Sequence, residues 1–259
     1  MNKYLYLDKQ TFYHRLDPRT KMIITLAHFI ASAALVEQLW VGFLVVLETL
    51  FFASISKSWK NIRGIRMILY SLSIMTIISW LIFGKGTTPL IWIVTKENLY
   101  QGISSVFRAF SSIIIAIVLL STTRNEELVE GCVHFGVPYR IAFAFSNALR
   151  MTPHLTGIAL TVVAAQKSRG LNLDKGGFMI KIKKTVPLIV PAMMLGLRST
   201  DVMTMAIEAK GFGYTKKRGN YNQLKLTKLD WILIAYAIIL AAGAIVLAAN
   251  GWFKVYDAL

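Results

Sequence analysis

Long apolar runs alternate along the chain with shorter polar segments that are mostly basic. A helix that crosses a bilayer needs about 20 mainly apolar residues. Runs approaching that length cover roughly residues 21–36, 39–55, 67–83, 104–122 and 230–250. Only Glu37 and Gln38 separate the first two runs, which indicates a tight hairpin. The pattern predicts an all-α integral membrane protein with about five transmembrane helices.

A mixed pattern distinguishes residues 123–229, which lie between the fourth and fifth runs. We expect a short helix over 123–137, and then two semi-apolar runs follow at 139–165 and 185–207. The two semi-apolar runs contain prolines, at Pro153, Pro187 and Pro191. Proline interrupts helices, so several helices are expected here rather than two straight ones.

These semi-apolar runs also contain charges, and a charge at the bilayer centre costs about 2.5–3.5 kcal/mol on insertion scales. If both runs were spans, the basic loop between them would lie outside. Its cations are Lys167, Arg169, Lys175, Lys181, Lys183 and Lys184. We therefore prefer a cytoplasmic helical coupling region over two further spans.

Charge and composition fit this plan and give the chain an orientation. The chain is 55% hydrophobic and only 16% charged, yet its net charge is +16. Lys and Arg accumulate in the cytoplasmic loops of membrane proteins, so the charge requires no nucleic-acid partner. The predicted parts are a membrane part at 1–122 with a cytoplasmic N-terminus, the cytoplasmic coupling helices at 123–229, and a last span with an external tail at 230–259.

Signatures of catalysis are missing from the sequence. It contains no G-x-x-x-x-G-K-[ST], no H-E-x-x-H and no G-x-S-x-G, which would mark a nucleotide, zinc or acyl-transfer site. We expect no catalytic residue, no metal site and no cofactor bound by this chain. Glu48 is the one clear carboxylate inside a predicted span. It has either a function of its own or a hydrogen bond to a neighbouring helix.

Two short stretches resemble one another, "AAQKSRG" at 164–170 and "MAIEAKG" at 205–211. Each consists of helix formers, then a cation, then a glycine suited to a left-handed C-terminal cap. A cation at a helix C-terminus gains about 0.3–1 kcal/mol from the helix dipole, which would make it a simple cap. The repetition favours a second interpretation, in which a slim helix end inserts Arg169 or Lys210 into a groove of a partner.

At these positions the chain resembles the transmembrane T component of energy-coupling factor (ECF) transporters, the EcfT/CbiQ-like family. That family carries two Ala-Arg-Gly signatures, which stand here as Ser168-Arg169-Gly170 and Ala209-Lys210-Gly211. The segment "HRLDPRTKM", His14 to Met22, and the order of spans are also similar. Lys210 departs from the family pattern because it keeps the charge of Arg without its bidentate fork.

The resemblance implies a non-catalytic scaffold in a prokaryotic plasma membrane. Two cytoplasmic ABC ATPases would bind ATP and Mg and dock on the two motifs. A small membrane S component would bind a vitamin or trace metal. The apolar residues expected to contact it are Phe143, Phe145, Leu188, Met193 and Met194. An ordinary ABC importer permease that lines the substrate path, and a membrane-embedded lipid enzyme, are the alternatives.

Overall fold

A computed structural model of the chain describes residues 9, 11–35, 39–84, 89–91, 94–171, 177–212, 214 and 226–250. These residues are almost entirely helical, which confirms the predicted all-α class. The chain forms two compact units. The first comprises Met1–Pro138 with Leu224–Leu259, and the second comprises Tyr139–Gln223.

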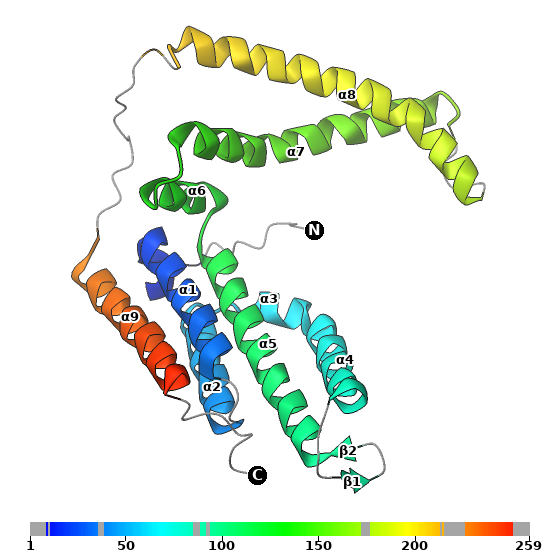
Figure 1. The fold of residues 1–259 in the computed structure, drawn as a ribbon. Helices are drawn as coiled ribbons and strands as arrows, with labels where there is room; N and C mark the ends of the chain where they lie inside the picture. Colours follow the sequence, from blue (N-terminus) through cyan, green and yellow to red (C-terminus); the bar gives the residue numbers. More distant parts are fainter. Residues whose placement is uncertain are drawn as a thin grey trace. The chain divides into compact units, whose positions relative to one another are not determined.

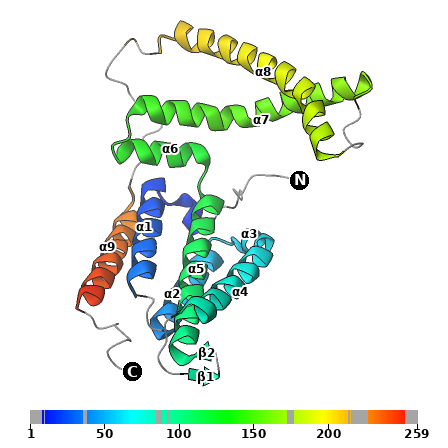
Figure 2. The same ribbon diagram turned by 45° about the vertical axis from the view of Figure 1, so that its right-hand side comes forward.

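The first unit is a bundle built around one long helix. Its elements are η1 (Phe12–Arg15), α1 (Pro18–Leu35), α2 (Leu39–Ile55), α3 (Trp59–Gly64), α4 (Arg66–Phe83), β1 (Pro89–Ile91), β2 (Val94–Thr95), α5 (Lys96–Thr122), α6 (Asn125–His134) and α9 (Lys228–Ala249). Helix α5 packs against α1, α2 and α4, while α9 and α6 pack against α1. Figures 1 and 2 show α5 between α1 and α4. The strands β1 and β2 form a small antiparallel pair before α5.

Buried apolar side chains fill the centre of this bundle. Phe52 of α2 packs edge-on against Tyr13 of η1, with ring centroids 5.9 Å apart. Ile115 and Val118 of α5 are fully buried in the same cluster. Burial raises the pKa of the Tyr13 phenol above its ordinary value. Side chains of η1 therefore pack in one core with side chains of α2 and α5.

The start of α1 is determined by the sequence Asp17-Pro18-Arg19. Asp17 precedes the helix, and its Oδ1 accepts a hydrogen bond of 2.9 Å from the backbone N–H of Arg19. Pro18 occupies the first helical position, where its missing N–H costs nothing and its fixed φ suits the helix. The Asp17 carbonyl then accepts from the Lys21 N–H at 3.2 Å. This segment is thus a sharply defined helix start.

Buried polar contacts connect this start to two distant segments. Lys21 is fully buried, and its Nζ donates to the carbonyls of His14 at 3.1 Å and Thr122 at 3.0 Å. The backbone N–H of Asp17 donates to Asp230 Oδ1 of α9 at 3.1 Å. Thr227 is the N-cap of α9, and its N–H donates to the other oxygen of Asp230 at 2.8 Å. These contacts join α1, α5 and α9 at one end of the bundle.

The second unit consists of two long helices, α7 (Tyr139–Ser168) and α8 (Phe178–Ala209). They run in opposite directions and cross (Figures 1 and 2). His154 Nε2 and Ser199 Oγ lie 2.9 Å apart across the crossing. The ring of Phe212, just after α8, lies 4.2 Å from the ring of Phe143 near the start of α7. The two helices are therefore antiparallel, and they touch at the crossing and again near the start of α7.

The expectation that proline divides this region into several helices is wrong. Pro153 lies inside α7, and Pro187 and Pro191 lie inside α8. Proline removes one backbone hydrogen bond but can bend a helix rather than end it. The half of α8 that carries its prolines is bent in Figure 1. Contacts beside Pro153, between His154 and Ser199, hold the two helices together across the interruption.

Helices occur at all five predicted spans, with one displaced boundary. Helix α5 begins at Lys96, eight residues before the predicted start at 104. Its first turns are amphipathic rather than apolar, and Asn98 Nδ2 anchors them by donating to the Gly84 carbonyl at 3.0 Å. The short helix expected over 123–137 is α6.

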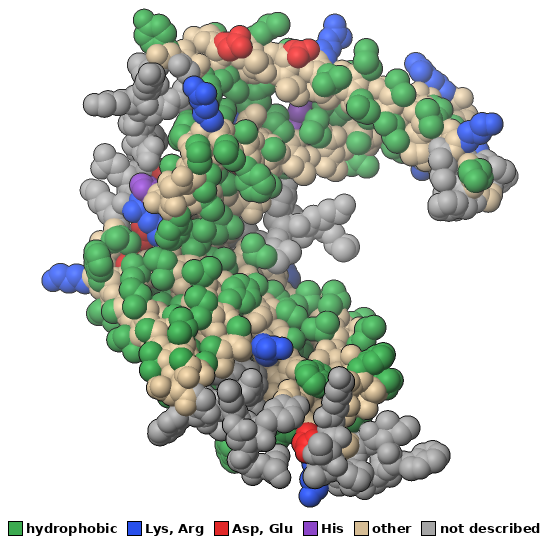
Figure 3. Space-filling model, in the orientation of Figure 1, with side chains coloured by type: hydrophobic (Ala, Val, Ile, Leu, Met, Phe, Trp, Pro, Cys, Tyr) green, Lys and Arg blue, Asp and Glu red, His purple; other side chains and the backbone are tan. Residues whose placement is uncertain are grey.

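Length and hydropathy sufficient for spanning occur, among the described residues, in α4, α5, α7, the Lys183–Ala209 part of α8, and α9. Helix α2 is apolar but shorter, and α1 begins with the basic residues Arg19 and Lys21. Figure 3 shows hydrophobic side chains over much of the visible face of each unit. The chain is thus a multi-pass membrane protein, and the cytoplasmic placement of 123–229 stays a prediction.

Candidate functional site

The first predicted tip ends helix α7 in a Schellman motif. Gly170 has φ +90°, the left-handed conformation that favours glycine. Its N–H donates to the Lys167 carbonyl at 3.0 Å, and the Leu171 N–H donates to the Gln166 carbonyl at 3.0 Å. These two bonds define the motif. They leave the Arg169 side chain exposed directly beyond the last helical residue, Ser168.

The second tip repeats this geometry at the end of α8. Gly211 has φ +72°. Its N–H donates to the Glu208 carbonyl at 2.8 Å, and the Phe212 N–H donates to the Ile207 carbonyl at 3.2 Å. Lys210 occupies the position that Arg169 has in the first tip, and its side chain is exposed. The expected left-handed glycine caps are therefore confirmed at both ends.

A third cap of the same kind ends α6 and serves as an internal reference. Gly136 has φ +99°, and its N–H donates to the Val133 carbonyl at 3.1 Å. The Val137 N–H donates to the Cys132 carbonyl at 3.2 Å. Phe135 stands where the other two caps carry a cation. The cap geometry is thus common to three helix ends, whereas the exposed cation is a feature of α7 and α8.

The sequence predicts this third helix end as well, because Gly136 with Pro138 is expected to end the helix over 123–137. In all three cases an apolar residue follows the glycine: Val137, Leu171 and Phe212. Each of these residues is half-buried, as expected for the hydrophobic contact that accompanies a Schellman motif. The motif is therefore glycine followed by an apolar residue, and the cation is an addition to it.

Both cations are available to a partner. Among the described residues neither Arg169 nor Lys210 forms an ion pair. Small side chains flank them, with Ser168 before Arg169 and Ala209 before Lys210. The carbonyl ends of the helices attract the cations, but Arg and Lys side chains reach well beyond a cap of this size. Each tip can therefore present one cationic head to a carboxylate or to backbone carbonyls.

The structure places the two tips at opposite ends of the helix pair. Phe212, two residues after Lys210, packs on Phe143 near the start of α7. Arg169 lies at the other end of α7, 26 residues after Phe143, which corresponds to about 39 Å at 1.5 Å per residue. The motifs therefore form two separate sites, not one composite site.

The five residues predicted to contact a membrane partner differ in their surroundings. Phe143 is engaged within the unit, in a cluster of three aromatic rings with Tyr139 and Phe212. Phe145, Met193 and Met194 are 60%, 61% and 66% exposed, and Leu188 is half-buried.

The two methionines belong to a larger apolar stripe along α8. It consists of residues three or four positions apart on the helix, and each is about half exposed or more: Val186, Ile189, Val190, Met193, Met194 and Leu197. We call this set the α8 stripe. Exposed apolar patches of this kind mark contacts with lipid or protein.

Glu48 is part of a polar cluster among three helices of the first unit. The Tyr236 hydroxyl of α9 donates a hydrogen bond to Glu48 Oε1. His28 Nδ1 of α1 lies 3.8 Å from the same oxygen. The geometry agrees with the second of the two interpretations of Glu48, a carboxylate hydrogen-bonded to a neighbouring helix. Within the described residues, no group of three or more His, Cys, Asp or Glu side chains forms a metal site.

The fold and these helix ends define a multi-pass α-helical membrane protein whose second unit presents two cationic tips. The profile of the CbiQ family, described as "Cobalt transport protein", matches residues 9–221. The chain therefore belongs to this family, as a transmembrane component of the ECF transporter type.

Curated relatives named "Energy-coupling factor transporter transmembrane protein EcfT" align over nearly the whole chain. The protein of Lactococcus lactis is 28% identical over 250 residues, covering 91% of this chain and 93% of its own length. That of Brevibacillus brevis is 26% identical over 265 residues, covering 96% of each. That of Staphylococcus aureus is 28% identical over 263 residues, covering 95% and 96%. The relatives are bacterial, and the likeness extends over both units.

Proposed function

We propose that this chain is the non-catalytic coupling subunit of an ABC-type importer. In this proposal two cytoplasmic ATPases bind ATP and Mg and hydrolyse the ATP. A separate small membrane protein, the S component, binds a vitamin or trace metal ion. The chain binds neither nucleotide nor substrate, and its second unit transmits the closure of the ATPases to the S component. The observation that carries the proposal is the pair of identical caps that present Arg169 and Lys210.

The separation of the tips supports two ATPase contacts rather than one. Arg169 lies about 39 Å along α7 from Phe143, on which the residue after Gly211 packs, so the two tips are too far apart for one groove to receive both. Helices transmit displacement better than loops because their backbone hydrogen bonds resist bending. In the proposal, the movement of each ATPase acts on one end of the α7–α8 pair.

The α8 stripe supports the other half of the proposal. It runs between the tips, and its exposed methionines are adaptable apolar contacts. A partner that rests on this stripe would be displaced when α8 moves. We assign the stripe, with Phe145, to the S component.

The test uses the complete complex, with both ATPases and the S component reconstituted in liposomes. Arg169→Glu and Lys210→Glu should each weaken the retention of one ATPase, and the double variant should abolish ATP-driven uptake. Arg150→Glu is the matched control, because Arg150 is an exposed cation in the middle of α7. It should leave uptake close to that of the wild type. Normal uptake by the double variant would refute the docking role.

An ordinary importer permease is the second candidate, favoured by the length and hydropathy of α7 and α8. If both helices crossed the bilayer, Arg169 would lie on the opposite side from Lys210. The sides can be distinguished by Ser168→Cys and Ala209→Cys in a Cys132→Ser background, labelled with an impermeant maleimide. The coupling proposal expects both positions to react from the cytoplasm only. Labelling of position 168 from outside would favour the permease.

A further inference from the structure

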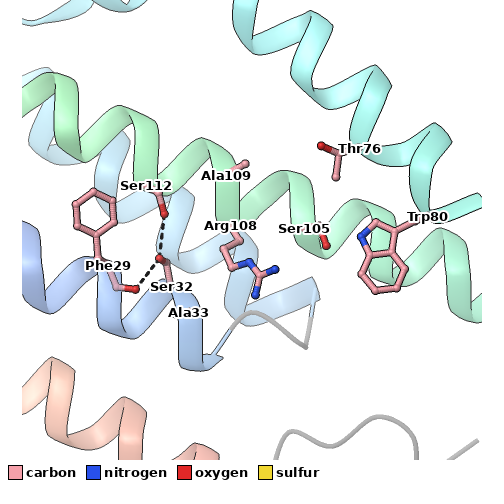
Figure 4. Close-up of a pocket in the computed structure, with 9 residues that line it drawn as sticks. All are labelled: Phe29, Ser32, Ala33, Thr76, Trp80, Ser105, Arg108, Ala109 and Ser112. Carbon is pink, nitrogen blue, oxygen red and sulfur yellow. Dashed lines mark hydrogen bonds between the residues drawn. The ribbon is translucent and has the colours of Figure 1, made fainter. Parts of the chain in front are cut away.

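An arginine lies in a groove of the first unit that the coupling mechanism does not use. The groove has a volume of about 530 Å³ and runs along α5 between α1 and α4. Figure 4 shows Arg108 extending from α5 into this space, between Ser32 of α1 and Trp80 of α4. Among the described residues the guanidinium of Arg108 forms no ion pair.

Among the described residues, the rest of the lining is rich in hydroxyl groups and contains no acidic side chain. Ser32 Oγ lies 3.1 Å from Ser112 Oγ of α5 and donates to the Phe29 carbonyl at 3.0 Å. Ser105 and Thr76 line the same space. Hydroxyls can donate hydrogen bonds, and a guanidinium has donors only. The groove therefore presents one full positive charge and several polar hydrogens without a negative partner in its lining.

The position of Arg108 along α5 determines its depth in a bilayer that this helix spans. It follows Lys96, the first residue of α5, by 12 residues, which corresponds to about 18 Å. Helix α5 has 27 residues and is about 40 Å long, whereas the hydrocarbon core is about 30 Å thick. If α5 spans the bilayer, Arg108 falls inside the core wherever the core is placed along the helix. An unpaired arginine at that depth is costly, so an anionic partner is expected.

We propose that this groove binds the headgroup phosphate of an anionic phospholipid. The guanidinium fork and the serine hydroxyls match the oxygens of a phosphodiester. Trp80 lies near the end of α4 and is of the type that marks a membrane interface. Leu26 and Phe29, exposed on α1, continue the apolar wall along which an acyl chain can lie. When the core begins about 10 Å after Lys96, Arg108 lies about 8 Å below that boundary, and its long side chain then lets the guanidinium reach a phosphate at the interface.

The test is native mass spectrometry of the purified full chain, equilibrated with phosphatidylglycerol or phosphatidylcholine. The wild type should retain one phosphatidylglycerol and bind phosphatidylcholine much more weakly. Arg108→Gln should weaken phosphatidylglycerol binding by about tenfold, as loss of a charge-assisted hydrogen bond implies. Lys96→Gln, an equal change of charge at the exposed start of α5, should have no comparable effect.

A second variant keeps the charge and fills the space. Ala109→Phe adds a ring beside Arg108 in the lining and should expel the lipid, so the proposal stays testable if Arg108→Gln does not fold. Equal retention of phosphatidylglycerol by the wild type and by the folded variants would overturn the proposal. So would a variant that keeps its lipid but no longer co-purifies with its membrane partner, because Arg108 would then pair with a carboxylate of that partner. Failure of this proposal would leave the coupling proposal unaffected.

Discussion

Lys21 offers the sharpest test of how the first unit is held together. Its ammonium group is fully buried and donates to the carbonyl of His14 before α1 and to that of Thr122 at the end of α5. The last four carbonyls of a helix have no partner within the helix. Lys21 thus donates a hydrogen bond to a carbonyl at the C-terminal end of α5, although it lies 101 residues away in the sequence.

Replacing Lys21 by Met would keep most of the side-chain volume and remove both donors. A buried acceptor left without a partner costs about 1–3 kcal/mol, so two acceptors together cost about 2–6 kcal/mol. Relief from burying an ammonium group offsets part of this cost. We expect a net loss of about 3 kcal/mol in the free energy of unfolding. For a chain of this size that corresponds to a melting temperature lower by roughly 6–12 °C.

The assay is thermal unfolding of the detergent-solubilised chain, followed by tryptophan fluorescence and by size-exclusion chromatography. Lys60→Met is the matched control, because Lys60 is exposed on α3. That variant should melt within about 1 °C of the wild type, as surface changes usually do. If Lys21→Met melted at the same temperature as Lys60→Met, the two hydrogen bonds would not support the bundle as described.

Three further predictions follow from single contacts. Alanine in a left-handed conformation costs about 1–2 kcal/mol, and no heavy atom lies within 4 Å of a Cβ at Gly211 or Gly136. Gly211→Ala and Gly136→Ala should therefore strain their caps equally. Only Gly211→Ala should reduce ATP-driven uptake. Glu48→Gln and Tyr236→Phe should each lower the melting temperature slightly. A double-mutant cycle should give a coupling free energy of about 0.6–1.7 kcal/mol. Additive effects of the two substitutions would contradict the hydrogen bond. Lys210→Arg restores a bidentate fork, so retention of the ATPase at that tip should equal or exceed that of the wild type, and weaker retention would show that the groove prefers an ammonium.

Local features of this chain were predictable from the sequence, and the reason is physical. The caps at Gly170 and Gly211 depend on a handful of consecutive residues, because both Schellman bonds close within six residues. These helix ends could therefore be predicted from the local sequence alone. The start of α5 at Lys96 could not be predicted in this way. Its first turns lack an apolar run, and Asn98 anchors them to the distant Gly84.

Features that depend on contacts between distant segments were not predictable. In the sequence, Lys21 is one of several basic residues in the N-terminal segment, which is predicted to be cytoplasmic. Nothing nearby in the sequence indicates that it is buried against Thr122. The contact beside Pro153 likewise joins residues that are 45 positions apart, His154 of α7 and Ser199 of α8. The role of Glu48 was undecided for the same reason, since its partner Tyr236 is 188 residues away.

The three caps together separate what a helix end needs from what the proposed coupling needs. A helix end requires the left-handed glycine and the apolar residue after it, and Gly136 with Val137 supplies both without a cation. Arg169 and Lys210 are therefore not needed for capping itself, and their gain of about 0.3–1 kcal/mol from the dipole is available to any cation in the last turn. Their placement on the outermost position of two antiparallel helices, at opposite ends, is what a subunit that receives force at two points requires. Lys210→Arg tests the chemistry of one such point, and Gly211→Ala against Gly136→Ala tests its rigidity, so the two kinds of variant separate the charge from the shape of the tip.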